Sequence, residues 1–292
     1  MSGFLEIMAA QSSQLDPVPT GLAPRLKKLD GIKAVVFDIY GTLFISGSGD
    51  ISLAGVQDLD SVMLEVLVAS GITWTQGATG ISQQFLEEIK ASHAGSRALG
   101  IDFPEVEIRE IWKGLLQCQG DGMPSDGAIE ALAVRYETTV NPVWPMPGLE
   151  ALLVELRARR MKLGIISNAQ FYTPLLFRHF LGRQLSSLGF DDELCVWSYR
   201  EGIGKPSQRL FDISVARLAS YGLSPCEVLY VGNDMRNDMV PAAAAGMRTA
   251  LFAGDARSLR LREHSVDALL VDVVLTRLDQ LLQCIDDSTS AS

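Results

Sequence analysis

Four polar clusters carry the residue types that hydrolytic chemistry needs, and each comes after a short apolar run. They are Asp38-Ile39-Tyr40-Gly41-Thr42, Ser167-Asn168, Lys205-Pro206 and the segment from Gly232 to Asp238. A carboxylate such as Asp38 can act as a nucleophile that divides one difficult displacement into two easier ones. A lysine can neutralise charge that builds up during such a reaction. Neighbouring carboxylates are the hard oxygen ligands that Mg²⁺ prefers.

The apolar runs before these clusters predict the strands of a buried parallel sheet. They are Ala34–Phe37, Leu163–Ile166, Leu194–Trp197, Val228–Val231 and Thr249–Phe252, with Ala268–Val271 as a further candidate. Helical patterns separate the later runs, at Leu149–Arg159, Ser207–Ala219 and Val240–Ala245. This alternation predicts an α/β core with a Rossmann-like, doubly wound parallel sheet. Ligands bind beyond the carboxyl ends of such strands, so the four clusters should converge there.

The segment 44–146 departs from this alternation. It contains helical patterns at Val56–Ala69, Ser82–His93, Val106–Gln117 and Asp126–Tyr136, but no strand pattern. We therefore predict an inserted helical cap domain over residues 44–146, and a core domain over residues 31–43 and 147–292. Residues 1–30 are predicted to be a leader, which should be loose where Ser12–Thr20 is polar and contains proline.

The composition limits the classes of partner and compartment. Hydrophobic residues make up 47% of the 292 and charged residues 21%, as in an ordinary globular protein. The net charge of -10, without a basic stripe, argues against a nucleic-acid partner but not against a small anionic substrate. The four cysteines lie far apart, so buried reduced thiols are expected rather than disulfides or zinc. Without a signal peptide or an apolar run of ~20 residues, we expect a cytoplasmic protein with no membrane contact; the oligomeric state is not predicted.

The order and spacing of the four clusters resemble the haloacid dehalogenase superfamily, which contains phosphatases, phosphonatases and dehalogenases. Its members place an aspartate and Gly-Thr after the first strand, a Ser or Thr after the second, a Lys before Pro, and paired acids after the fourth. The matching residues here are Asp38 with Gly41-Thr42, Ser167, Lys205-Pro206, and Asp234 with Asp238. The resemblance covers residues 34–44 and 147–252, and not the insert.

The resemblance implies a hydrolase that forms a covalent aspartyl intermediate with a small substrate. The nucleophile, the hydroxyl donor and the cation beside them would be Asp38, Ser167 and Lys205. Thr42 and Asn168 are the candidates for substrate binding. The candidate ligands of a Mg²⁺ cofactor are Asp38, Asp234 and Asp238. The insert would lie over the site as a lid, because both of its ends emerge beside the nucleophile.

Two departures from the family pattern concern the proton donor and the metal. Most phosphatases of the family have a second aspartate as general acid and base where this chain has Tyr40, and a tyrosine with a pKa of ~10 is a poor base at neutral pH. The form from Asp38 to Leu43 is similar to the 2-haloacid dehalogenases, whose halide leaving group needs no proton. Those enzymes work without metal and lack the first acid of the last motif, whereas both acids are present here. The usual Gly-Asp pair is Gly232-Asn233, so the first metal ligand is either Asn233 or Asp234.

Three functions follow as hypotheses. The first is Mg²⁺-dependent hydrolysis of a small phosphorylated metabolite, with Tyr40 counted among the catalytic residues. The alternatives are carbon–halide hydrolysis without metal, and a phosphate-ligand sensor with little catalysis. The dehalogenase hypothesis lacks the substrate-binding arginine of that group, because Arg97 and Arg109 are in the wrong place for it. The histidines and tryptophans, including His93 and Trp112, are expected to serve mainly in packing.

Overall fold

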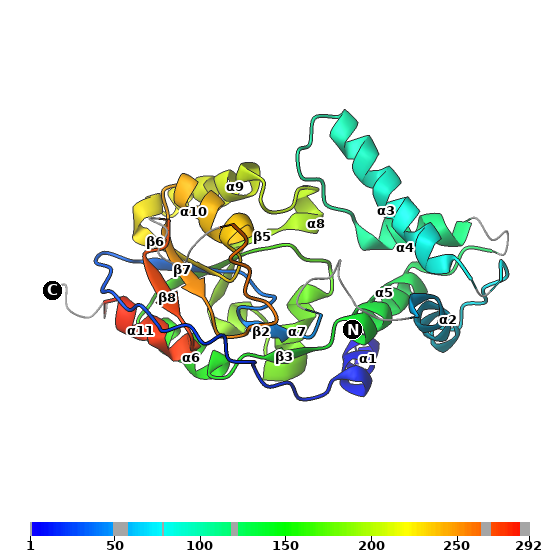
Figure 1. Cartoon of the computed structure of the whole chain (residues 1–292), viewed down its shortest axis with the longest axis horizontal. Coiled ribbons are helices and arrows are strands. Elements are labelled where there is room, and N and C mark those ends of the chain that lie inside the picture. The colour runs from blue at the N-terminus through cyan, green and yellow to red at the C-terminus, as the bar shows by residue number, and fades with distance from the viewer. Residues whose placement is uncertain (1, 49–57, 78, 118–121, 264–269, 287–292) are drawn as a thin grey trace.

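The computed structural model describes residues 2–48, 58–77, 79–117, 122–263 and 270–286, and its main feature is a parallel sheet (Figure 1). The sheet contains six strands in the described chain, in the order β5-β4-β1-β6-β7-β8. Their bounds are β1 Ala34–Phe37, β4 Lys162–Ser167, β5 Phe190–Trp197, β6 Val228–Gly232, β7 Arg248–Phe252 and β8 Val273–Leu275. The five main predicted strands are confirmed. The further candidate begins outside the described residues, at 268 and 269, and the strand found nearby is β8.

Successive residues of the strands are buried on opposite faces of this sheet. In β1, Val35 and Phe37 join one hydrophobic cluster, while Ala34 and Val36 join the other. Helices α6 (Leu149–Ala158), α7 (Thr173–Leu181) and α11 (Leu281–Cys284) contribute to the first cluster. Helices α9 (Gln208–Ser220) and α10 (Val240–Ala244) contribute to the second. Because both faces are covered, the strands are apolar throughout, and the predicted doubly wound α/β core is confirmed.

The insert enters and leaves the core through a short antiparallel pair of strands. These are β2 (Phe44–Ser46) and β3 (Val143–Pro145). Between them, the described residues form α2 (Leu59–Ala69), α3 (Ile81–Ala98), α4 (Ile108–Gln117) and α5 (Asp126–Val140). The four predicted helices are present, although the start of the first prediction, at residues 56 and 57, lies outside the described residues. The expectation of no strand in 44–146 was wrong, because three-residue strands carry too little periodic signal to be recognised.

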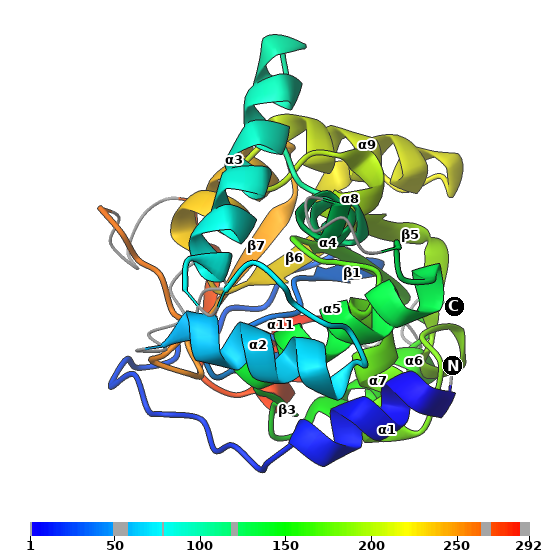
Figure 2. The same ribbon diagram turned by 90° about the vertical axis from the view of Figure 1, so that its right-hand side faces the viewer.

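The N-terminal segment contains a helix that the prediction of a leader over residues 1–30 did not include. Residues Ser2–Gln11 form helix α1, which packs against α5 of the insert and α7 of the core (Figure 2). Met8 is only 1% exposed there. The following stretch is tied to the core, since the Val18 amide donates to Asp255 Oδ1 at 3.0 Å and the Thr20 hydroxyl donates to the Ala253 carbonyl at 2.8 Å. The apolar side chains of α1 find a partner surface that becomes visible only in three dimensions.

Within the described residues, no helix is both long and apolar enough to cross a membrane.

Candidate active site

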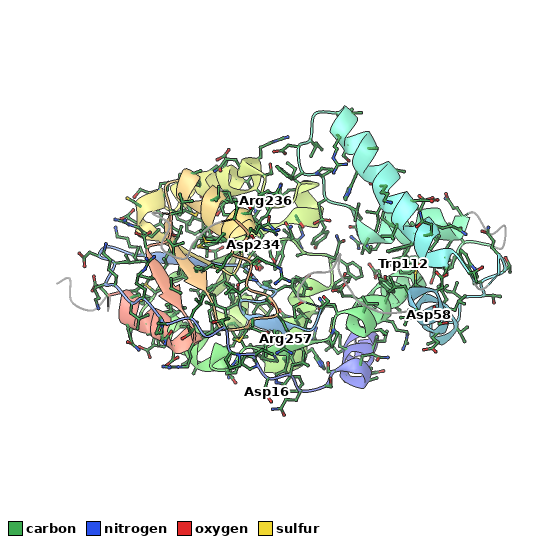
Figure 3. All side chains as sticks on the ribbon, in the orientation of Figure 1. Asp16, Asp58, Trp112, Asp234, Arg236 and Arg257 are labelled. Atoms are coloured by element: carbon green, nitrogen blue, oxygen red, sulfur yellow. The ribbon has the colours of Figure 1, made fainter. Side chains whose placement is uncertain are left out.

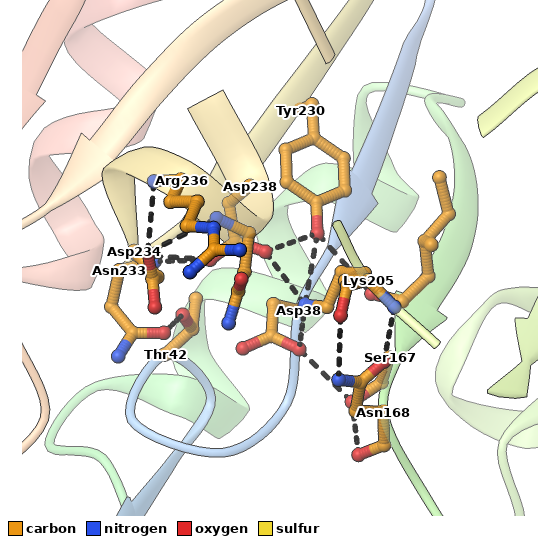
Figure 4. A network of polar contacts seen from close by, with 12 residues as sticks. Asp38, Thr42, Ser167, Asn168, Lys205, Tyr230, Asn233, Asp234, Arg236 and Asp238 are labelled. Atoms are coloured by element: carbon orange, nitrogen blue, oxygen red, sulfur yellow. Dashed lines mark hydrogen bonds and ion pairs between the residues drawn. The ribbon is translucent and has the colours of Figure 1, made fainter. Parts of the chain in front are cut away.

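Three of the predicted catalytic residues meet at the carboxyl edge of the sheet (Figure 4). The Ser167 hydroxyl donates to Asp38 Oδ1 at 2.9 Å, and the Lys205 ammonium donates to the same oxygen at 2.7 Å. Asp38 Oδ2 accepts no hydrogen bond from the described residues, and Asp38 lines a cavity. One carboxylate oxygen is thus fixed by the protein while the other remains available.

The sheet itself brings these residues together. Asp38 follows β1, and its amide continues the ladder by donating to the Val231 carbonyl of β6 at 2.9 Å. Ser167 ends β4, which pairs with β1 on the other side. The chain then turns at Gly41, where φ is +81° and an added Cβ would lie 2.4 Å from Ser258 Cβ. Only glycine fits this turn, which keeps the loop after Asp38 tight against its neighbours.

Lys205 connects two buried carboxylates. Its ammonium lies 2.7 Å from Asp38 Oδ1 and 2.6 Å from Asp238 Oδ1, and the Tyr230 hydroxyl donates to the same Asp238 oxygen at 2.9 Å. Burial alone would lower the pKa of Lys205, but the charges of Asp238 and Asp38 raise it above its usual value. Burial raises the pKa of Asp238 to about 6 even though Lys205 opposes this shift. Lys205 is therefore a cation at neutral pH, anchored to Asp38.

Asp234 and Asp238 are both saturated by hydrogen bonds from the protein. Asp234 Oδ1 accepts from the backbone amides of Arg236 and Asn237, at 2.9 and 3.0 Å. The Arg262 guanidinium donates to both Asp234 oxygens, at 3.0 and 2.6 Å. Asp238 Oδ2 accepts the amides of Asn233 and Asp234, at 3.0 and 2.9 Å.

This saturation decides whether the predicted magnesium ligands fit a metal ion. No group of three or more His, Cys, Asp or Glu side chains in the described chain is arranged to hold one. Of the carboxylate oxygens of Asp38, Asp234 and Asp238, only Asp38 Oδ2 is without a partner there. The predicted set therefore does not fit Mg²⁺ in this arrangement, and Arg262 supplies the positive charge beside Asp234.

The remaining predicted residues have different positions. Asn168 lines the cavity. Its side-chain oxygen Oδ1 accepts a hydrogen bond of 2.7 Å from the Lys205 backbone amide. Thr42 is fully buried and donates to Asn233 Oδ1 at 3.3 Å, and it is not among the residues that line the cavity. Tyr40 lines the cavity and shares a hydrogen bond of 3.0 Å with the Thr173 hydroxyl. Burial, followed by the charge of Glu137, raises the pKa of Tyr40 far above its usual value, so Tyr40 does not titrate near neutral pH.

A family model described as haloacid dehalogenase-like hydrolase matches residues 32–246. The chain belongs to this family. It is therefore a hydrolase, as the four clusters predicted. The matched residues run from just before β1 to just after α10 and include the insert.

Relatives of known activity include phosphatases. The chain is 26% identical over 257 residues to the glyceraldehyde 3-phosphate phosphatase of Methanothermobacter thermautotrophicus, covering 86% of this chain and 100% of that one. It is 26% identical over 233 residues to the phosphoglycolate phosphatase of Escherichia coli K12, covering 76% and 81%.

Solved structures share the fold of this haloacid dehalogenase-like hydrolase. A 2-haloacid dehalogenase from Pseudomonas syringae pv. Tomato DC3000 superposes with a TM-score of 0.52 at 21% identity, over 86% of this chain and 96% of that one. A phosphatase of the same superfamily from Thermococcus onnurineus gives 0.50 at 21% identity, with the same coverage. At this identity the likeness concerns the fold and does not discriminate between the two activities.

The cavity of this hydrolase lies between the core and the insert and has a volume of about 600 Å³. His93 and Arg97 of α3 line it, whereas Arg109 pairs with Glu107 and Glu130. Trp112 does not line it; this side chain is fully buried within the insert (Figure 3), 4.5 Å from the Phe85 ring.

Sequence reasoning missed several residues of the site. Tyr230 lies within an apolar strand, so the sequence predicts a residue of the hydrophobic core at this position. Arg262 reaches the site because the loop after β7 pairs with the last motif, with the Met235 amide donating to the Arg260 carbonyl at 2.9 Å. Glu105 and Glu137 line the cavity from the insert, and no spacing in the sequence relates them to Asp38.

Proposed function

We propose that this hydrolase cleaves a small phosphorylated metabolite through a covalent intermediate on Asp38. The observation that carries the proposal is the asymmetry of the Asp38 carboxylate. Oδ1 is held by Lys205 and Ser167 at 2.7 and 2.9 Å, while Oδ2 is without a partner among the described residues. A fixed carboxylate with one available oxygen at the base of a cavity is suited to nucleophilic attack.

In the proposed reaction, Asp38 attacks phosphorus and the bond from phosphorus to the leaving oxygen breaks. Lys205 and the Ser167 hydroxyl offset negative charge that builds up on the transferring group. Water then attacks the acyl phosphate, which releases inorganic phosphate and restores Asp38. Burial holds the pKa of Tyr40 far above its usual value and makes its hydroxyl a weak acid, so a leaving group of low basicity suits this site.

The relatives support phosphate as the transferred group, because the names of the relatives given above are those of phosphatases. Lys205 and Arg260 both border the cavity and can offset the charge of a phosphate group, although Asp38, Asp234 and Asp238 line it as well. In this proposal the insert, residues 44–146, acts as a lid over a core of residues 31–43 and 147–292. It already rests on the loop before Lys205, where the Gly204 amide donates to the Phe103 carbonyl at 2.7 Å.

A second candidate is carbon–halide hydrolysis, and one observation favours it. The Arg262–Asp234 pair leaves the predicted magnesium set incomplete, and a halide leaves without either a metal or a proton donor. Under the first proposal, a cytoplasmic location and a requirement for magnesium remain predictions.

The decisive experiment compares wild type and Asp38→Asn on phosphate esters and 2-haloacids, each with and without Mg²⁺. The change is nearly isosteric and removes the nucleophile. We expect release of phosphate by the wild type and less than a few per cent of that rate in the variant. Release of halide but not phosphate would contradict the phosphatase proposal and favour dehalogenation. Equal rates of the two proteins would overturn the role of Asp38.

A further inference from the structure

The cavity that begins at Asp38 is far larger than a phosphate group. At about 600 Å³, it falls within the range of pockets that enclose drug-sized ligands. The catalytic residues occupy only its base. The remaining walls belong to the insert and to the adjoining core loops, so most of its volume is available to the part of the substrate that leaves.

Aromatic side chains border this space on several sides. They come from α3, α5 and the loops of both parts: Tyr40, Phe85, Phe103, Tyr136 and Tyr172. Leu86 and Ile89 add an aliphatic surface along α3. Leu86 is 44% exposed, so part of its side chain is accessible to a ligand in the cavity. Aromatic rings gain from stacking against a flat apolar group, beyond the area that they bury.

The acidic residues in these walls do not favour a second anion. Besides the aspartates of the active site, two glutamates line the cavity: Glu137 is 7% exposed, and Glu105 accepts a hydrogen bond of 2.8 Å from Ser198. Burial raises the pKa of both carboxyls. The cations of the insert, His93 and Arg97, belong to the last turns of α3, where Arg97 is exposed. Burial lowers the pKa of His93, which makes this imidazole a weaker cation.

We propose that the substrate is an aryl phosphate, a monoester whose leaving group is an uncharged phenol. This inference rests on the proposed phosphatase function and names its substrate class. The aromatic lining of the cavity carries it, and Tyr40, which lies beside the nucleophile, is one of the rings in that lining. A phenolate, whose acid has a pKa of ~10, leaves far more readily than an alkoxide.

The reaction balances without a further reactant. Asp38 forms a bond to phosphorus, the bond to the phenolic oxygen breaks, and its electron pair stays on the phenolate, which takes a proton from water and leaves hydroxide. The hydroxide attacks phosphorus of the acyl phosphate, and the bond from phosphorus to Asp38 breaks, which restores the carboxylate. The products are one phenol and one inorganic phosphate. Phosphoglycolate and glyceraldehyde 3-phosphate, by contrast, would leave the aromatic walls uncovered.

The first test measures binding without turnover. The Asp38→Asn variant is titrated by calorimetry with methylphosphonate, phenylphosphonate and 4-carboxyphenylphosphonate. We expect phenylphosphonate to bind at least tenfold more tightly than methylphosphonate, and the added carboxylate to remove most of this gain. Equal affinities of the methyl and phenyl compounds, or no binding of either, would overturn the assignment. This series measures the binding preference of the cavity, and it does so even if the chemistry on Asp38 proves different.

The second test uses a matched pair of substitutions on the insert. Leu86→Asp places a charge on the cavity wall, while Leu99→Asp changes a leucine that is 85% exposed and does not line the cavity. We expect kcat/KM for phenyl phosphate to fall at least tenfold in the first variant and to stay within twofold in the second. An equal response of both variants, or higher kcat/KM of the wild type for phosphoglycolate than for phenyl phosphate, would contradict the aryl class.

Discussion

Replacing Lys205 by methionine should destabilise the protein in a pH-dependent way. The substitution keeps the length of the side chain but removes the cation between Asp38 and Asp238, which are 6% and 1% exposed. Breaking a buried pair by removing one partner typically costs about 3–5 kcal/mol. The cost has a ceiling, because Asp238 can take up a proton instead of remaining as an isolated buried anion.

The ceiling follows from the ordinary pKa of aspartate, 3.8. At pH 7 this pKa lies about three units below the pH of the solution. Each unit corresponds to about 1.36 kcal/mol, so protonating one aspartate costs about 4 kcal/mol. In the variant, the pKa of Asp238 is raised above that of the unfolded chain. The folded variant then holds a proton that the unfolded chain lacks, and its stability rises as the pH falls.

The measurement is urea unfolding of both proteins between pH 6 and pH 8. At pH 6 about half of the wild type, whose Asp238 pKa is about 6, also carries this proton, whereas above pH 7 little of it does. The stability difference should therefore shrink by up to about 1.4 kcal/mol for each unit of decreasing pH above pH 7, and by less below it. Lys33→Met is the control, since this lysine is 62% exposed and pairs only with Glu227 at the surface. A difference below about 1 kcal/mol at pH 7, or one that does not change with pH, would refute the buried-pair account.

Three further predictions concern other parts of the molecule. Tyr40→Asp should supply a proton donor beside Asp38 and raise turnover of alkyl phosphates at least tenfold, while aryl phosphates gain much less, because general acid catalysis contributes roughly 10²–10⁴-fold. Equal gains for both classes would mean that proton donation is not the missing element. Arg262→Gln should release Asp234, so that added Mg²⁺ raises the melting temperature of the variant more than that of the wild type; equal shifts would show that the arginine does not compete with the metal. Met8→Ala should lower the free energy of unfolding by about 2–5 kcal/mol, and an unchanged urea midpoint would argue that α1 does not contribute to the stability of the whole protein.

The core could be predicted from the sequence because its strands are apolar on both faces and end at recognisable polar residues. The run from Ala34 to Phe37 predicts a strand without ambiguity, and Asp38 marks its end. The contact of Asp38 with Ser167 then follows from the geometry of a parallel sheet, whereas Lys205 reaches Asp38 from the segment that follows β5. The helices of the insert were recognisable because their apolar residues recur at helical spacing.

The rest depends on side-chain orientation, which sequence periodicity does not specify. Thr42 looked like a substrate contact because it follows Asp38 closely, but the turn at Gly41 directs it toward Asn233. Asp234 looked like a metal ligand, but its oxygens are taken up by Arg262, which is brought near by backbone pairing between two loops. The strand pair β2–β3 was missed because each strand is only three residues long.

The central position of β1 has a consequence for synthesis on the ribosome. This strand pairs with residues 162–167 on one side and 228–232 on the other, and the whole insert is translated between β1 and its first partner. The apolar segment Ala34–Phe37 therefore emerges long before any strand can cover it, and contacts of such large sequence separation form slowly. We expect nascent chains that stop before residue 228 to hold β1 exposed and to bind chaperones that recognise apolar segments. Catalytic competence would appear late in translation, once β6 completes the neighbourhood of Asp38.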